Sequence, residues 1–365
     1  MSSTGKKKVF SLNLHGLGDF IMSMPVLKAL KQNGCYDGIT VMVWPAVEEF
    51  ARSVPFIDEV IALPKDKEQD PALSDFIREL TPRGGFDLVL DFSFMPRAGI
   101  ITKAASAKRT MGFGIDLQTC PWYTDSVPNH PQEHRLQRNY HLLELLGIKL
   151  PERPDFTVTV SGKTRLRVDR LLAERGIDLE REHPIALHPG SGVSRRNWAP
   201  ERFALLADML TEHTGERVIL LGGRNRTYDG CDESALAARV EAHMQRPVVN
   251  LAGCLSLPEL VLLLGRCSLF VGNNSGPAHL AAAVARTPCL LVWAPRNEKL
   301  WRPVGAKVEI VFAESFCSEH CPLNQCTNMQ YCLGLISASD VFERYIQAFA
   351  PGQACVQTLR REDEN

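Results

Sequence analysis

A run of small and polar residues, Asn-Asn-Ser-Gly-Pro-Ala-His at 273–279, carries the clearest chemical signal in the chain. It follows an apolar segment that predicts a buried strand, and a helix is expected to begin near Gly276. Free amide groups at the start of a helix bind anions, and small residues let a phosphate come close. His279 falls in the first turn, where its imidazole would donate to a phosphate or sugar oxygen. We therefore expect an anion-binding loop here.

A second loop of small residues and hydroxyls follows the predicted strand Pro184–His188. Ser191 and Gly192 would let phosphate oxygens approach the backbone. Arg195 or Arg196 would supply bidentate positive charge to a diphosphate. A turn followed by a solvated arginine pair is the alternative interpretation of the same residues.

The third loop, His15-Gly16-Leu17-Gly18-Asp19, follows the first predicted strand. Its glycines allow a sharp turn, and Asp19 is expected at the start of the next helix. Asp19 is then either a helix cap, the commonest role of aspartate at such a position, or a general base facing a site above the sheet. Neither Gly-x-Gly-x-x-Gly nor Gly-Lys-Ser/Thr occurs here, so the common nucleotide-binding loops are excluded at this position.

The elements that carry these loops alternate between strand and helix, which is typical of a doubly wound parallel sheet. In the first half we expect strands at Val9–Leu14, Ile39–Trp44, Glu59–Leu63 and Phe86–Asp91, with helices after Asp19 and at Val47–Ser53 and Pro71–Leu80. In the second half we expect strands at Pro184–His188, Arg217–Leu221, Val248–Leu251, Leu269–Gly272, Cys289–Trp293 and Val308–Phe312. The helices between them are expected at Pro200–Thr211, Glu233–His243, Leu257–Gly265, Gly276–Ala285 and Ala338–Phe349. Ligands of such sheets bind at the carboxyl ends of the strands, where all three loops fall.

The length of 365 residues is enough for two domains of this kind, at roughly 100–200 residues each. We place them at residues 1–165 and 166–350, followed by a polar tail at 351–365. The join lies within 151–183, a stretch with prolines, an alternating segment at Phe156–Val160 and a charged helix at Thr164–Gly176.

Composition excludes several classes of protein. The formal net charge of -1 does not favour nucleic acid as a partner. No apolar stretch reaches the roughly 20 residues that span a bilayer, and the polar start lacks the apolar core of a signal peptide. We therefore expect a cytoplasmic protein, at most peripheral to the inner membrane.

Four of the 11 cysteines form a cluster at Cys317, Cys321, Cys326 and Cys332. Their spacings differ from the paired Cys-x2-Cys of ordinary zinc ribbons. In a cytosolic protein the cluster is either a structural zinc or iron site or a loop of reduced cysteines.

Taken in order, the three loops make the chain resemble glycosyltransferase family 9, the bacterial ADP-heptose:lipopolysaccharide heptosyltransferases. The resemblance runs from Val9 to about Phe349. It rests on five segments, namely Gly18-Asp19 with Met24–Leu27, His188–Gly190, Arg196–Trp198 with Pro200–Phe203, Leu251–Gly253, and Ser275–Leu280.

This resemblance implies a glycosyltransferase-B fold, with two Rossmann-like domains, an N-terminal acceptor half and a C-terminal donor half, and a last helix that packs back on the N-terminal domain. It implies that Asp19 deprotonates the acceptor and that no cofactor is needed for the chemistry. The donor-binding residues that it implies are Ser191, Gly192, Arg196, Leu255, Ser256, Leu257, Asn274, Ser275, Gly276 and His279.

The chain departs from the family pattern at three places. Arg196 stands where a lysine is usual, and arginine changes the geometry of the phosphate contact. Asn274 replaces an aspartate that touches the donor sugar. The loop at 224–232 is long, and Asp229, Asp232 and Glu233 all remain candidates for the carboxylate that binds the donor ribose.

The function that we expect is inverting transfer of a heptose from ADP-heptose to a lipopolysaccharide-core or related bacterial glycan or glycolipid. Glycosylation of an autotransporter protein or a natural product is the alternative. A nucleotide-sugar epimerase and a non-catalytic binder are the other classes. Lys103, Lys108, Arg109, His134, Arg135 and Arg138 form a basic set that would either meet a phosphorylated acceptor or lie on a solvated surface.

Overall fold

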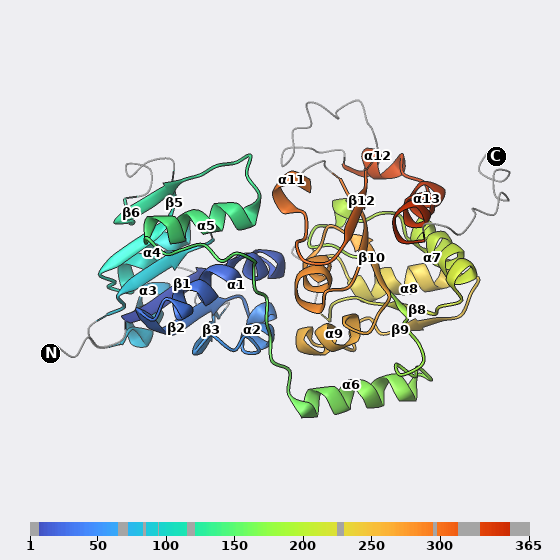
Figure 1. Ribbon diagram of the computed structural model, residues 1–365, viewed down its shortest axis with the longest axis horizontal. Coiled ribbons are helices and arrows are strands. Elements are labelled where there is room, and N and C mark those ends of the chain that lie inside the picture. The colour runs from blue at the N-terminus through green and yellow to red at the C-terminus, as the bar shows by residue number, and fades with distance from the viewer. Residues whose placement is uncertain are drawn as a thin grey trace.

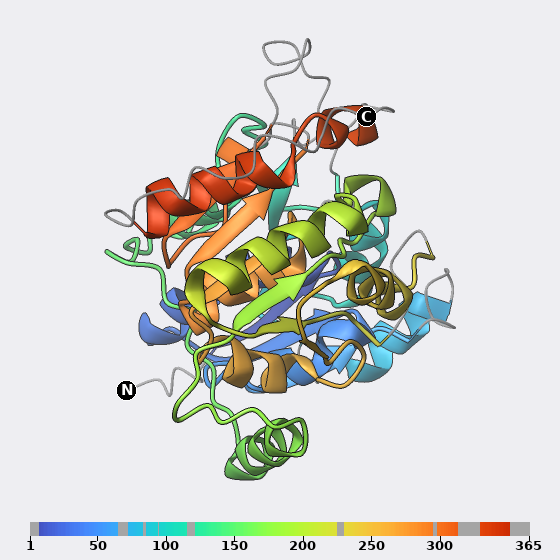
Figure 2. The same cartoon turned by 90° about the vertical axis from the view of Figure 1, so that its right-hand side faces the viewer.

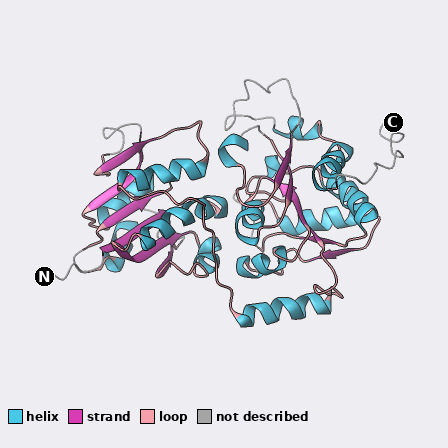
Figure 3. Ribbon diagram, in the orientation of Figure 1, coloured by secondary structure: helices cyan, strands magenta, loops and turns pink. Residues whose placement is uncertain are grey.

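The computed structural model describes residues 7–64, 72–82, 85–93, 95–114, 121–224, 230–294, 298–312 and 329–350. These residues form two lobes, each built on a six-stranded parallel sheet with helices on both faces (Figures 1 and 3). The expected pair of doubly wound α/β domains is confirmed.

The first sheet has the strand order β3-β2-β1-β4-β5-β6. Its strands are β1 (Lys7–Asn13), β2 (Tyr36–Val43), β3 (Glu59–Ala62), β4 (Leu88–Asp91), β5 (Arg109–Gly114) and β6 (Asp125–Pro128). Its helices are α1 (Leu17–Gln32), α2 (Pro45–Ala51), α3 (Ala72–Leu80), α4 (Pro96–Ala104) and α5 (Arg135–Leu145).

Alternate residues of these strands point to opposite faces, and each face packs against its own helices. Val9, Val41 and Leu90 point to the face with α1, α2 and α5, whereas Phe10 and Val89 point to the face with α3 and α4. Nearly every strand residue is buried because helices cover both faces, as parallel sheets require.

The second sheet has the order β12-β11-β10-β7-β8-β9. Its strands are β7 (Ile185–His188), β8 (Val218–Leu220), β9 (Val248–Asn250), β10 (Leu269–Asn273), β11 (Cys289–Val292) and β12 (Val308–Val311). Its helices and turns are η2 (Ser194–Arg196), α7 (Pro200–Thr214), α8 (Glu233–His243), α9 (Leu257–Leu264), α10 (Gly276–His279), η3 (Leu280–Ala285), α11 (Glu298–Trp301), α12 (Met329–Gly334) and α13 (Ala338–Phe349).

The last helix, α13, packs on its own lobe. It contacts α7, β11 and β12, and Ala338 and Val341 are buried in the same apolar cluster as Phe203 and Leu290. Figure 2 shows α13 lying across the second sheet beside α7. The expectation that this helix packs back on the N-terminal domain is therefore wrong for its described residues, because its apolar face is already covered by α7.

One apolar cluster runs through both lobes. It joins the face of the first sheet that carries α1, α2 and α5 to the face of the second sheet that carries α9 and η3, and α1 contacts α10 while α2 contacts α9. The two lobes therefore meet through these helices.

Between α5 and β7 the chain contains one helix, α6 (Gly162–Glu174), which lies below the second lobe in Figure 1. It packs on α9, and Arg167 of α6 forms an ion pair with the buried Glu259. The alternating segment Phe156–Val160 is extended but pairs with neither sheet, and its Thr159 amide donates to Ser53. Among the described helices, none is long and apolar enough to cross a membrane.

Candidate active site

Asp19 lies in the first turn of α1, at the carboxyl end of β1. The helix begins at Leu17 with Gly16 as its N-cap, so the capping role considered for Asp19 is wrong: the helix starts two residues earlier. The carboxylate remains 23% exposed, and it lies near the positive end of the helix dipole. It is therefore an accessible carboxylate at the edge of the sheet where ligands bind.

Arg135, the first residue of α5, is the charged partner of Asp19. Its Nε lies 3.4 Å from Asp19 Oδ1, and its own side chain is only 3% exposed. The guanidinium also donates to the carbonyl of Phe92 and lies 5.8 Å from the ring centres of Phe113 and of Trp301 in the other lobe. Burial lowers the pKa of Arg135, while Asp19 and Asp91 oppose that shift. A fixed guanidinium thus holds the orientation of the Asp19 carboxylate.

Asp91, at the end of β4, is a second carboxylate in this region. It is buried and accepts hydrogen bonds from Tyr123 and from the hydroxyl and amide of Ser93. Burial raises its pKa against the effect of these hydrogen bonds. Asp91 is therefore a buried carboxylate whose charge acts on Arg135, whereas the carboxylate of Asp19 is partly exposed.

The first turn of α1 packs against the first turn of α10 in the second lobe. A Cβ on Gly18 would lie 2.8 Å from Cδ2 of His279, and a Cβ on Gly276 would lie 3.0 Å from Cβ of Leu17. Only glycine fits at both positions without movement of a neighbour. The anion-binding loop predicted at 273–279 thus lies directly beside the residue next to Asp19.

His279 is buried in this contact. Burial, followed by the nearby His134, lowers the pKa of His279 to about 4, so the ring is neutral near pH 7 and would act as an N–H donor. Its Nδ1 is buried and has no hydrogen-bond partner among the described residues. The expected continuous helix 276–285 is α-helical only to His279 and then becomes a π-helical turn, η3, a widening that often occurs at functional sites.

Asn273 joins two of the predicted donor loops. Its side-chain oxygen accepts from the Trp198 amide at 3.1 Å, and its nitrogen donates to the Pro189 carbonyl at 2.7 Å. The side chain is fully buried, and β7 and β10 are neighbouring strands. The loops that carry Ser191, Gly192 and Arg196 on one strand and Asn274, Ser275 and Gly276 on the other are therefore held side by side.

Within these loops the side chains differ in availability. The Ser191 hydroxyl donates to the Val193 carbonyl at 2.6 Å, so it shapes its own loop. Arg196 lies in η2, where burial and then Arg195 lower its pKa, and its Nε has no hydrogen-bond partner among the described residues. Ser275 Oγ is likewise buried without one. Arg196 and Ser275 therefore have hydrogen-bonding capacity for an anionic ligand.

The loops after β8 and β9 are also tied together. Arg224 donates to the carbonyls of Gly253 and Cys254, each at 2.9 Å, which fixes the segment before α9. Leu255 and Leu257 are partly buried there, and the Ser256 amide donates to Glu259 at 2.8 Å. The segment predicted to cradle the base is thus a fixed helix start.

Of the three candidate ribose-binding carboxylates, two are described and they differ in role. Asp232 caps α8 by accepting from the amides of Ser234 and Ala235. Glu233 accepts from the Gly223 amide at 2.6 Å and lies 3.4 Å from His188. Burial raises its pKa, but His188 and the Gly223 amide outweigh this and lower it. Asp229 lies outside the described residues.

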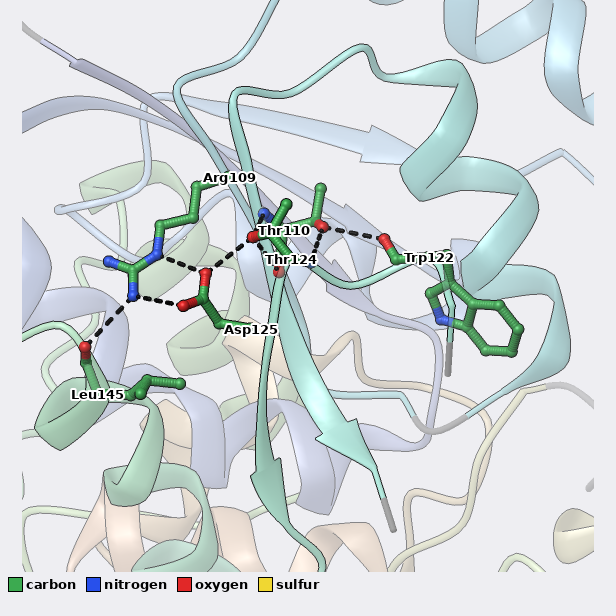
Figure 4. Close-up of polar contacts among 6 residues, drawn as sticks. All are labelled: Arg109, Thr110, Trp122, Thr124, Asp125 and Leu145. Atoms are coloured by element: carbon green, nitrogen blue, oxygen red, sulfur yellow. Dashed lines mark hydrogen bonds and ion pairs between the residues drawn. The ribbon is translucent and has the colours of Figure 1, made fainter. Parts of the chain in front are cut away.

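The basic set of the first half is split between two ends of the sheet. Lys108 pairs with Asp87, and Arg109 pairs with Asp125 and donates to the Leu145 carbonyl (Figure 4). Arg109 begins β5 and therefore lies at the amino end of a parallel strand, away from Asp19. Lys103 lines a surface cavity of about 650 Å³ between α3, α4 and Trp122. Only His134, Arg135 and Arg138, on or beside the start of α5, lie near the carboxyl ends.

Three members of the cysteine cluster, Cys317, Cys321 and Cys326, lie outside the described residues. The fourth, Cys332 in α12, is half-buried and packs against the apolar cluster around α7.

Sequence patterns did not single out Asp91, and they gave His134 and Arg135 only as members of the basic set, without the contacts that these two residues make. His134 Nε2 lies 2.8 Å from the Arg302 carbonyl of the other lobe, and Arg135 reaches Asp19 across 116 positions of sequence. The signal that could have found them is the dipeptide His134-Arg135 at a helix start, which becomes informative only once α5 is placed beside α1.

The model of glycosyltransferase family 9 (heptosyltransferase) matches residues 75–332. The chain belongs to this family. It is 25% identical to lipopolysaccharide heptosyltransferase 3 of Escherichia coli K12 over 298 residues, covering 78% of this chain and 82% of that protein.

Solved structures of family members share the fold. A family 9 glycosyl transferase from Veillonella parvula superposes with a TM-score of 0.79 at 21% identity, covering 92% of this chain and 95% of the other. The E. coli ADP-heptose lps heptosyltransferase II superposes with a TM-score of 0.71 at 18% identity, covering 93% of this chain and 98% of the other. This family 9 chain has the glycosyltransferase-B fold and is a glycosyltransferase.

Proposed function

We propose that this family 9 enzyme transfers a heptose from ADP-heptose to a hydroxyl of a lipopolysaccharide-core or related glycolipid acceptor, with inversion at the anomeric carbon. Family membership and the similarity to lipopolysaccharide heptosyltransferase 3 support a heptosyl donor. The observation that carries the proposal is the contact between Gly18 and His279, which sets the base at Asp19 beside the predicted diphosphate loop.

On the donor side we assign the diphosphate to two neighbouring loops. Arg196 would supply positive charge, and Ser275 and the amides at the start of α10 would donate hydrogen bonds. A neutral His279 would donate one more N–H. These groups would stabilise the negative charge that develops on the leaving diphosphate.

On the acceptor side we assign Asp19 as the base. The acceptor oxygen would attack the anomeric carbon, its proton would pass to the Asp19 carboxylate, and the bond from that carbon to the diphosphate oxygen would break with both electrons leaving on the diphosphate. Arg135 would keep the carboxylate aimed at the acceptor hydroxyl. Arg138 lies one helical turn further along α5 and would face an anionic group of the acceptor. Burial, and then the nearby charge of Arg135, lower the pKa of Arg138 to about 10.

The proposal is tested by product analysis with ADP-heptose and a panel of nucleotide-hexoses, each with and without a lipopolysaccharide-core acceptor. We expect a heptosylated acceptor from ADP-heptose. In Asp19→Asn, transfer should fall by about 10²–10⁴-fold while donor affinity, measured by calorimetry, stays within a few-fold. Preference for another sugar would overturn the donor assignment, and retained turnover in Asp19→Asn would overturn the base.

A further inference from the structure

Three potential metal ligands gather where the chain enters α5, outside the donor loops. His130 and Glu133 lie in the segment between β6 and α5, and His141 lies on the helix. One ligand atom from each residue lies within 4.8 Å of the other two. His141 Nε2 is 2.7 Å from Glu133 Oε2, and the His130 and His141 rings are 5.0 Å apart between centres.

These side chains form a donor set suited to a particular class of cation. Two imidazole nitrogens and one carboxylate oxygen match Zn²⁺ and neighbouring divalent transition metals, whereas Ca²⁺ and Mg²⁺ prefer oxygen ligands alone. Ligands at normal bond lengths around one Zn²⁺ lie about 3.4 Å apart. Small side-chain rotations would therefore bring these three atoms onto one ion.

A fourth residue completes the arrangement. Glu144 Oε2 lies 2.7 Å from His141 Nδ1, on the side of the ring away from Glu133. A carboxylate that accepts from the outer nitrogen of a metal-bound histidine fixes the ring and its tautomer, and such partners accompany most histidine ligands. Here the contact with Glu144 leaves Nε2 of His141, which points to Glu133, as the atom that would coordinate the ion.

We propose that His130, Glu133 and His141 bind one divalent transition metal ion of the Zn²⁺ class, oriented by Glu144 and with a fourth position open to solvent. This site is separate from the cysteine cluster at 317–332 and does not depend on the proposed heptosyl transfer.

The position of the site indicates a structural role. His134 and Arg135 follow Glu133 directly, and they contact Arg302 of the other lobe and Asp19 respectively. An ion that ties residues 130–133 to His141 would fix the segment from which both contacts start. The metal would then hold the partner of Asp19 in place without touching substrate.

The test is metal binding by the full-length protein after chelator treatment. Zn²⁺ is titrated in competition with a chromophoric chelator, and bound metal is counted by elemental analysis after dialysis. The variants are His130→Gln, Glu133→Gln and Glu144→Gln, and the matched control is His183→Gln, which changes an exposed histidine elsewhere. Circular dichroism checks that each variant is folded.

We expect His130→Gln and Glu133→Gln to bind one Zn²⁺ fewer than the wild type or the control. Glu144→Gln should keep the ion with about 10-fold weaker affinity. Equal stoichiometry and affinity in all five proteins would overturn the proposal, because any ion bound would then lie elsewhere.

Co²⁺ substitution separates this site from thiolate ligation. Imidazole and carboxylate ligands give visible d–d bands without the near-ultraviolet charge-transfer bands of cysteine thiolates. We expect a visible spectrum that His130→Gln removes, with any thiolate bands unchanged. A wild-type spectrum that His130→Gln leaves unaltered would equally overturn the assignment.

Discussion

Gly18 of α1 lies against the imidazole of His279 in α10, so close that a Cβ on Gly18 would be 2.8 Å from Cδ2 of the ring. This contact brings the first turns of two helices from different lobes together. One turn carries Asp19, and the other belongs to the loop that we assign to the donor diphosphate. This contact therefore helps to set the relative position of Asp19 and that loop.

Replacing Gly18 with alanine should disturb this contact without weakening α1. Alanine favours a helix over glycine by up to about 1 kcal/mol, but its methyl group would push against His279 at a cost of about 1–3 kcal/mol. We expect Gly18→Ala to lower turnover about tenfold or more, measured by steady-state kinetics. The control is Gly16→Ala, whose added methyl would meet nothing within 4 Å. Equal activity of the two variants would contradict the interpretation.

Arg135 should matter through its shape as well as its charge. Arg135→Lys keeps a cation near Asp19 but loses the planar group that lies between Phe113 and Trp301 and that donates to Phe92. We expect kcat to fall by roughly 10–100-fold, with a smaller change in the KM for the donor. Arg109→Lys, at the opposite end of the sheet, should leave both constants nearly unchanged. A loss confined to KM would show that Arg135 serves binding alone.

His279 should make stability depend on pH. Its pKa is about 4 in the folded protein, against an ordinary value of 6.5. Between these two pH values the histidine is protonated in the unfolded chain but not in the folded protein. The contribution of His279 to the free energy of unfolding is therefore fully present above pH 6.5, and it decreases as pH falls toward 4, by at most about 1.4 kcal/mol per pH unit. Urea unfolding at pH 5 and pH 7 should show a smaller difference in His279→Gln than in the wild type. His183→Gln should retain the full difference.

Asn273 should contribute mainly to stability, unlike its neighbour Asn274. Asn273→Ala leaves the Trp198 amide and the Pro189 carbonyl buried without this partner, which should lower the free energy of unfolding by about 2–4 kcal/mol. Replacing the half-buried Asn274 with alanine should lower the free energy of unfolding by roughly 0.5 kcal/mol or less. Denaturant unfolding measures both, and similar losses would contradict the bridging role of Asn273.

The strands and loops of the second half were largely predictable because they repeat a local pattern. The apolar runs Val218–Leu221 and Leu269–Val271 are each followed directly by glycine, and the helix expected at Ala338–Phe349 has both of its observed ends. The segment from Phe92 to Leu150 was not assigned in advance. Its strand β5 contains Gly112, which is explained by the Tyr123 ring packed against it from the segment just before β6.

The site shows the same division. Asp19, Ser275 and His279 follow strands and stand out by type and spacing, so their places could be predicted. The pairing of Arg135 with Asp19 depends on how α5 packs beside α1. The gathering of His130, Glu133 and His141 depends on the path of the segment that leads into α5. Conversely, the alternation at Phe156–Val160 suits a strand, but these residues pair with neither sheet.

The contact between the first turns of α1 and α10 is reciprocal: Gly18 receives His279, and Gly276 receives Leu17. Each half supplies one small and one large residue. A substitution at one of these positions therefore needs a matching substitution in the other half to keep the two surfaces complementary. A chimera that joins this N-terminal half to the C-terminal half of a relative should work only when that relative keeps both a glycine and an imidazole at these two positions. We therefore expect these four residues to limit which halves of the family are interchangeable.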